Sequence, residues 1–282
     1  MNYRHAFHAG NFADVMKHAL LVRILAYLQR KEAPLRVIDT HAGIGLYDLS
    51  SDAAQRTGEW AAGIGRLDTP LPPEAEEILA PYRAVVEAVR ARQGPKTYPG
   101  SPAIVREMLR RNDQGVFVEL HPRDHATLSE RYNAVANLKV LHLDAWVALH
   151  SLIPPKEKRG LVLIDPPFEE PNELERLGAE LLKAVRKWPT GTYAAWYRIK
   201  DLAPVDAVTK ALDAECPRPG LRPELFIDQP DDPARLNGCG LFVVNPPWTL
   251  RDEAEVLLPA LADRLARAGY GAYRVERFGT AE

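Results

Sequence analysis

The chain has 282 residues, 46% of them hydrophobic and 26% charged, and a formal net charge of −2. This composition indicates a packed globular protein and excludes a disordered chain or a uniformly basic nucleic-acid coat. Two cysteines without a CxxC pair exclude a disulfide framework, and no apolar stretch resembles a signal peptide or a membrane span. We expect a cytoplasmic protein without membrane contact and, since no coiled-coil pattern occurs, a monomer.

The N-terminal segment combines aromatic, basic and histidine side chains. Such a mixture before a helix favours an arm that contacts RNA, in which Tyr3 is available to stack on a base. Because His5, His8 and His18 lie close to Asp14 in the sequence, the alternative is the metal site of a hydrolase, although the HExxH spacing is absent. We prefer the RNA-contacting arm and expect no metal.

Residues 13–31 carry apolar side chains at helical spacing, which predicts a long amphipathic helix ended by Pro34. Short apolar runs typical of buried parallel strands follow, most of them separated by helical patterns such as 123–136 and 172–187. This alternation predicts an α/β protein with an open, mostly parallel sheet and ligands bound beyond the carboxyl ends of the strands. The apolar runs lie at 35–39, 116–120, 138–144, 161–165 and 241–245.

A loop with two glycines, residues 39–45, follows the first predicted strand. Gly43 lets a ligand approach the backbone closely, and a helix N-terminus beyond it would offer free N–H groups. The loop therefore predicts a nucleotide cofactor site, with a tight turn as the alternative, since the pattern is not the GxGxxG of dinucleotide-binding folds.

The chain between the first two predicted strands is longer than one crossover helix requires. Its excess, residues 51–97, contains several prolines around a helical pattern at 74–92. We interpret it as a small helical insertion subdomain in a main domain formed by residues 1–50 and 98–282, of which residues 1–20 hold the substrate-contacting motif and the start of the first helix.

Basic side chains concentrate in residues 1–36, with six basic and two acidic groups, and in residues 81–112, with seven basic and two acidic groups. Solvated helix faces are the common explanation, but two such segments make a phosphate-binding footprint plausible. Ser101, at the exit of the insertion, either caps the next helix or contacts the cofactor.

Acidic residues end three successive predicted strands. Glu119 ends the second strand and can accept hydrogen bonds from both hydroxyls of a ribose. Asp144 ends the third strand and is placed to meet the amino group of an adenine. Together they indicate an adenosyl cofactor.

Asp165-Pro166-Pro167-Phe168, after the fourth strand, carries the strongest signal. Asp165 and the Pro166 carbonyl can accept both hydrogens of an exocyclic amine, which draws the nitrogen lone pair out of conjugation and makes it a nucleophile. Phe168 would stack on the ring of the flipped base. The alternative is a rigid structural loop.

A second copy of this pattern, Asn245-Pro246-Pro247-Trp248, follows the last predicted strand. Asparagine can also bind an amine, but strands near the end of such sheets often reverse direction. We therefore expect this copy to point away from the cofactor and to be a structural turn.

At this point the chain resembles the RlmJ family, S-adenosylmethionine-dependent methyltransferases that modify N6 of an adenine in 23S ribosomal RNA. The resemblance covers nearly the whole chain. Its motifs are YRHAFHAGNFADVMKH (3–18), DTHAGIGLY (39–47), RTGE (56–59), YPGSP (98–102), ELHP (119–122), RGLVLIDPPF (159–168), GTYAAWY (191–197) and VVNPPW (243–248).

The resemblance implies a class I, Rossmann-like methyltransferase fold with a small helical insertion, and 23S rRNA as the substrate in naked or precursor form. It implies that Asp165 is the catalytic acceptor of the amine and that Tyr3, His5 and Lys17 contact or position the RNA. The implied S-adenosylmethionine site is lined by His18, His41, Gly43, Ser101, Glu119, Asp144, Ala145 and Asp165.

Three positions depart from the family pattern: Phe168 stands where tyrosine is commoner, Ala145 where glycine is common, and Phe12 where a polar residue is usual. Stacking by an aromatic ring survives the first change, so the departures touch fine contacts and not the reaction class. A DNA adenine-N6 methyltransferase remains the chemical alternative, disfavoured because no helix-turn-helix pattern is evident.

Overall fold

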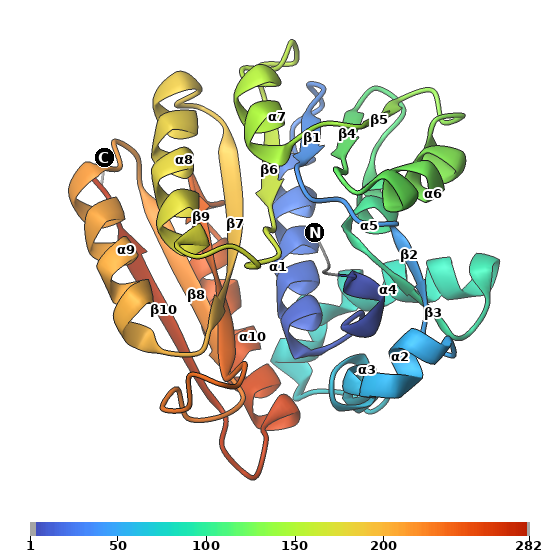
Figure 1. Cartoon of the computed structure of the whole chain (residues 1–282), viewed down its shortest axis with the longest axis vertical. Helices are drawn as coiled ribbons and strands as arrows, with labels where there is room; N and C mark the ends of the chain where they lie inside the picture. The colour runs from blue at the N-terminus through green and yellow to red at the C-terminus, as the bar shows by residue number, and fades with distance from the viewer. Residues whose placement is uncertain (1–3, 281–282) are drawn as a thin grey trace.

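An eight-stranded sheet with helices on both faces forms the body of the computed structural model, which describes residues 4–280 (Figure 1). The strand order is β10-β8-β9-β7-β6-β1-β4-β5, and the five strands from β7 to β5 are parallel. β9 runs antiparallel to both of its neighbours, and β10 antiparallel to β8. The predicted mostly parallel α/β sheet is thus confirmed.

All five apolar runs are strands, and five further strands within residues 4–280 were not predicted, three of them in the main sheet. The predicted ones are β1 (Arg36–Asp39), β4 (Gln114–Val118), β5 (Leu138–Leu141), β6 (Gly160–Ile164) and β9 (Gly238–Val244). The additional ones are β7 (Thr192–Ile199), β8 (Gly220–Phe226) and β10 (Ala272–Phe278), and a separate hairpin pairs β2 (Leu46–Asp48) with β3 (Thr97–Pro99).

Alternate side chains of each central strand enter two hydrophobic cores, one on either face of the sheet. In β6, Leu161 and Leu163 belong to one core and Val162 and Ile164 to the other. The first core is covered by α1 (Phe12–Leu28), α4 (Pro73–Gln93), α5 (Ser101–Met108), α6 (Pro122–Tyr132) and α10 (Leu250–Leu265), and the second by α7 (Ala145–Ser151), α8 (Glu173–Lys187) and α9 (Leu202–Glu215).

Helix α1 is not amphipathic, contrary to the prediction. Most of its residues, the polar Asp14, Lys17 and His18 included, are buried, because the helix lies between the sheet and the helices α4 and α10. It ends at Leu28, before the predicted limit, and Asn11 caps its start by accepting a hydrogen bond from the Asp14 N–H at 3.0 Å. The buried polar residues therefore face other protein groups, not solvent.

The predicted insertion is helical. It contains α2 (Asp52–Thr57), α3 (Glu59–Ala62), the 3₁₀ turn η2 (Ile64–Leu67) and α4. Buried residues of α4 belong to the same core as those of α1, and α4 packs on α1, α5 and α10. The division of the chain at residues 51 and 97 stays a prediction. No helix among residues 4–280 has the length and apolar character of a membrane span.

Candidate active site

The carboxyl ends of β1, β4, β6 and β7 border a cavity of about 950 Å³, together with α1 and the segment before it. Tyr3 lies outside the described residues. Every other predicted site residue lines this cavity: His5, Lys17, His18, His41, Gly43, Ser101, Glu119, Asp144, Ala145, Asp165, Pro166 and Phe168. The fold thus brings together residues that are up to 163 positions apart in the sequence.

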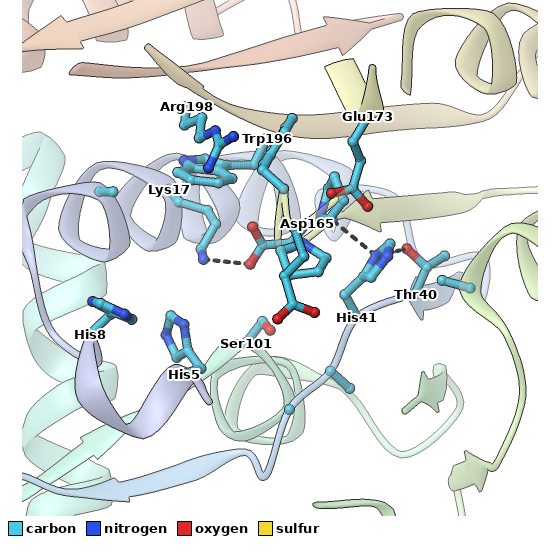
Figure 2. Close-up of a pocket in the computed structure, with 18 of the residues that line it drawn as sticks. His5, His8, Lys17, Thr40, His41, Ser101, Asp165, Glu173, Trp196 and Arg198 are labelled. Carbon is cyan, nitrogen blue, oxygen red and sulfur yellow. Dashed lines mark hydrogen bonds and ion pairs between the residues drawn. The ribbon is translucent and has the colours of Figure 1, made fainter. Parts of the chain in front are cut away.

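Lys17 joins the N-terminal segment to the Asp165-Pro166-Pro167-Phe168 motif. Its Nζ lies 2.6 Å from Oδ2 of Asp165 and 3.0 Å from Oδ1 of Asp14, and Figure 2 shows the side chain directed at Asp165 across the cavity. Burial alone would lower the pKa of Lys17, but the two carboxylates raise it above its usual value, so the ammonium keeps its charge. Lys17 is a permanent cation beside Asp165.

Asp14, which the sequence associated only with a metal, organises this end of the cavity. Its Oδ2 accepts hydrogen bonds from His5 Nε2 and from the Gly10 N–H, both at 2.9 Å. Burial alone would raise the pKa of Asp14, but His5 and the Lys17 ammonium hold it well below its usual value. A buried carboxylate therefore fixes both His5 and Lys17 in position.

Each of the three N-terminal histidines has a hydrogen-bond partner of its own. His8 contacts Glu59 at 2.9 Å, His5 contacts Asp14, and His18 Nδ1 lies 2.8 Å from the Tyr98 hydroxyl. Burial lowers the pKa of His18 to about 3, so its imidazole is neutral. Within residues 4–280 no group of three or more metal-ligating side chains is found.

His41 supports the backbone at Asp165. Its Nδ1 accepts a hydrogen bond from the Asp165 N–H at 3.3 Å and lies 2.9 Å from Oγ1 of Thr40 (Figure 2). Burial lowers the pKa of His41 to about 4, which keeps the imidazole neutral and Nδ1 able to accept. His41 therefore connects the loop after β1 to the loop after β6.

Glu119 fixes the backbone of the glycine loop that follows β1. Its carboxylate accepts hydrogen bonds from the Gly43 N–H at 2.9 Å and from the His121 N–H at 2.7 Å. Burial raises the pKa of Glu119, against the opposing effect of these two N–H groups. Gly43 has a φ of +60°, and a Cβ there would lie 2.3 Å from the Tyr47 hydroxyl oxygen, so only glycine fits.

Asp144 and Ser101 have structural contacts of their own. Asp144 caps α7, with Oδ1 accepting from the N–H groups of Trp146 and Val147 at 2.9 and 3.0 Å. Ser101 does not cap α5, because Gly100 occupies the cap position and the Ser101 side chain hydrogen-bonds Asp39. The capping alternative for Ser101 is therefore wrong.

Asp39, which sequence reasoning did not single out, does not line the cavity but accepts a hydrogen bond from the N–H of His41, which does. It is fully buried, and its Oδ2 has no hydrogen-bond partner within residues 4–280. Burial raises the pKa of Asp39 to about 7, assisted by the nearby charge of Asp165 and opposed by the hydrogen bond from Ser101. Its place directly after a buried strand was the available signal.

The Phe168 ring is nearly buried, so less of it is accessible to a stacking base than the sequence suggested. The ring is 6% exposed, makes an edge contact with Trp196 at 5.6 Å between centroids, and has the Arg198 guanidinium 5.3 Å from its centre. Its φ of +54° is unusual for a bulky residue and fixes the direction of the loop. The neighbours of Phe168 thus include a cation from β7.

The Asn-Pro-Pro-Trp copy is structural, as predicted. β9 runs antiparallel to β7, so Asn245 follows the end of its strand at the edge of the sheet opposite to Asp165. The Asn245 side chain donates to the carbonyls of Pro189 and Gly191 at 2.9 and 2.7 Å and accepts from Arg218 at 3.2 Å. Its amide is fully used in holding a turn.

Sequence reasoning also missed the side of the cavity formed by β7. Trp196, Arg198 and Lys200 line it, together with Glu173 at the start of α8. Residues two apart on a strand share a face, so the spacing of 196, 198 and 200 was the signal that could have placed them together.

Comparison with known proteins gives the family. A family model described as Ribosomal RNA large subunit methyltransferase D, RlmJ, matches residues 32–278. The chain is 37% identical over 278 residues to Ribosomal RNA large subunit methyltransferase J of Haemophilus influenzae, and 36% identical over 273 residues to the protein of that name from Escherichia coli. The alignments cover 98% of both chains in the first case and 96% in the second.

A crystal structure of a Legionella pneumophila protein has the same fold, with a TM-score of 0.85 and 32% identity, over 96% of this chain and 98% of that one. The mostly parallel sheet and the site at its carboxyl edge are those of a class I methyltransferase. The predicted resemblance is confirmed, and the chain belongs to the RlmJ family of large-subunit ribosomal RNA methyltransferases.

Proposed function

We propose that this protein transfers the methyl group of S-adenosylmethionine directly, without a metal, to N6 of one adenine in 23S rRNA. The observation that carries the proposal is the placement of Asp165 in the cavity. Its carboxylate is bonded to Lys17 and its N–H to His41, and it lies between the residues that fit a cofactor and those that fit a base. The working form is a cytoplasmic monomer acting on naked or precursor rRNA. The family's work on rRNA leaves no role for the hydrolase alternative.

The residues on one side of Asp165 fit an adenosyl cofactor. Gly43 leaves space where any side chain would collide with Tyr47, and Glu119 and Asp144 present carboxyl groups to the same cavity. His18, His41, Ser101 and Ala145 complete this side. When bound, the cofactor supplies an electrophilic methyl group on a sulfonium, and the acidic residues around it suit its positive charge.

On the other side, Asp165 and the Pro166 carbonyl would accept the two hydrogens of the adenine amine. The base is taken out of its stack and held beside Phe168, with Tyr3 and His5 contacting the nucleotide. With both hydrogens accepted, the nitrogen lone pair points away from the ring plane toward the methyl group. On transfer, the bond between the methyl group and the sulfonium sulfur would break and S-adenosylhomocysteine would leave, while N6 would give up one proton toward Asp165.

Lys17 has two effects on this step. Its ammonium places a positive charge beside the Asp165 carboxylate, and by bonding Oδ2 it leaves Oδ1 as the oxygen for the amine. His41, through the Asp165 N–H, fixes the loop on which both acceptors lie. Lys17 and His41 are therefore positioning residues in this proposal, whereas Asp165 touches the reacting atom.

The test is methyl transfer from labelled S-adenosylmethionine to unmodified 23S rRNA and, separately, to adenine-containing duplex DNA, with Asp165→Asn beside the wild type. We expect N6-methyladenosine in the rRNA only, and a loss of at least about 100-fold in the variant with cofactor affinity kept. Labelling of DNA alone would favour the DNA adenine methyltransferase instead. A variant as active as the wild type would refute the role of Asp165.

A further inference from the structure

The side of the cavity formed by β7 has no task in the reaction described so far. Trp196, Arg198 and Lys200 occupy alternate positions at the carboxyl end of the strand, line the cavity and are half-buried. Figure 2 shows Arg198 and Trp196 beyond Lys17 as seen from His5 and Ser101. In the sheet, β6 with Asp165 lies between β7 and the strands β1, β4 and β5 that precede the cofactor residues. This wall therefore borders the substrate half of the cavity.

Both cations of this wall lack a bonded carboxylate in the described part of the chain. Within residues 4–280, neither Arg198 nor Lys200 forms an ion pair, whereas Arg23 and Arg110 are each bonded to an acidic side chain. Burial lowers the pKa of Arg198, opposed only by the charge of Glu173. Burial also raises the pKa of Glu173, which makes it a weak counter-ion. An external anion would relieve the uncompensated charge.

The wall reaches the reaction centre through aromatic contacts. The Arg198 guanidinium lies over the Phe168 ring, Trp196 contacts the same ring, and Lys17 Nζ lies 5.6 Å from the centre of the Trp196 ring. Residues two apart on a strand are separated by about 7 Å. Arg198 and Lys200 can therefore engage different phosphate groups of one strand, next to a base held at Phe168.

We propose that Trp196, Arg198 and Lys200 form a binding site for the phosphodiester backbone beside the target adenine. The inference rests on the proposed function, because it takes the base at Asp165 as its starting point. Guanidinium and ammonium groups match phosphate oxygens, and an indole beside them suits a splayed single strand better than a rigid duplex. The site fixes the strand on both sides of the flipped nucleotide without reading its sequence.

The other anion of the reaction, the carboxylate of the cofactor's methionine, is the competing occupant. Gly43, Glu119 and Asp144 follow β1, β4 and β5, on the far side of β6 and Asp165 from β7. A carboxylate held there would leave Arg198 and Lys200 uncompensated. We therefore favour the RNA backbone, and affinity for the cofactor becomes a discriminating measurement.

The test uses Arg198→Gln, Lys200→Gln and their double variant in the full chain. The probe is a fluorescein-labelled single-stranded oligoribonucleotide with one central adenine, titrated at several salt concentrations with S-adenosylhomocysteine present. Each phosphate contact to a single strand contributes about 0.7 to the slope of log affinity against log salt, so the double variant should lose about 1.4. We expect its affinity at low salt to fall by roughly tenfold or more.

Lys210→Gln is the matched control, since Lys210 is an exposed cation on α9 outside the cavity. It should keep the affinity and salt slope of the wild type. Arg198→Lys should keep the slope, because the charge remains, while losing part of the affinity. Unchanged affinity for S-adenosylhomocysteine in every variant shows that each one is folded and that the cofactor's carboxylate is not the ligand.

A double variant with the wild-type salt slope would overturn the inference, and so would an equal loss in Lys210→Gln. Cofactor affinity that falls while the slope stays constant would assign the cations to the cofactor and overturn it too. These readouts do not depend on methylation. If the wild type binds RNA with the expected slope but methylates no rRNA adenine, the proposed function fails and the backbone site stands.

Discussion

Replacing Lys17 by methionine removes the charge from the centre of the active site while keeping the length of the side chain. Lys17 is 4% exposed, and its partners Asp14 and Asp165 are 1% and 16% exposed. Because removal of one partner leaves buried carboxylates uncompensated, the expected cost is about 3–5 kcal/mol. For a chain of this size that corresponds to a fall in Tm of roughly 5–8 °C.

The pH dependence gives this prediction its sharpest form. Asp14 has a lowered pKa in the folded protein, so it contributes stability above its unfolded value of 3.8 and loses it as pH falls below that value. Lys17 has a raised pKa and contributes at all pH values below 10.5. Without Lys17, the pKa of Asp14 rises, and protonation then relieves the unpaired charge. The gap in Tm between wild type and variant should therefore be largest near pH 7 and shrink toward pH 4.

Differential scanning calorimetry of the wild type and the variant between pH 4 and pH 9 measures this gap. Arg23→Met is the control, since Arg23 lies on the same helix as Lys17. Its ion pair with Glu253 of α10 is more exposed, so breaking it should cost less. Methyl transfer should fall together with stability, while S-adenosylhomocysteine still raises Tm. If the Lys17 variant had the same Tm as the wild type at pH 7, or if the Tm gap between them did not narrow on acidification, the reasoning would be refuted.

Three further predictions concern the walls of the site and its second motif. Asp39→Asn should gain Tm relative to the wild type as pH rises from 5 to 8. The pKa of Asp39 is raised from 3.8 in the unfolded chain to about 7 in the folded protein, so the wild type loses stability as pH rises between these values, whereas asparagine does not titrate. A Tm difference that stays constant with pH would contradict this. Gly43→Ala should weaken S-adenosylhomocysteine binding, measured by calorimetry, by at least about tenfold. Adding Tyr47→Phe removes the colliding oxygen and should restore part of the affinity. The rest should stay lost, because the strained φ alone costs about 1–2 kcal/mol. Asn245→Ala should destabilise the protein by roughly 2–3 kcal/mol in urea unfolding through its lost hydrogen bonds, with cofactor affinity unchanged; weaker cofactor binding would return this motif to the active site.

Local sequence determined the central strands and the position of the site. Continuous apolar runs identify buried parallel strands, because each face of such a strand meets a helix, and polar residues directly after them are bound to gather at one edge of the sheet. The Asp165 motif was predictable for this reason. The reversal of β9 was expected from its place in the chain, which separated Asn245 from Asp165 before any coordinates.

Other strands are hidden in the sequence because charged residues interrupt them. β8 is fully buried although it contains Arg222 and Glu224, and only the tertiary structure supplies their partners, Glu276 and Arg274 on the adjacent β10. A charge that is neutralised across a sheet looks in the sequence like a charge in solvent.

The tertiary structure alone decided which polar groups meet. Lys17 reads as one exposed position of an amphipathic helix, yet the helix is buried on nearly all sides and Lys17 meets an acid 148 residues away. The raised pKa of Asp39 and the unpaired cations of β7 likewise depend on burial and on distant neighbours. Sequence fixes which groups a strand or helix carries, whereas solvation and charge compensation come from the elements packed around them.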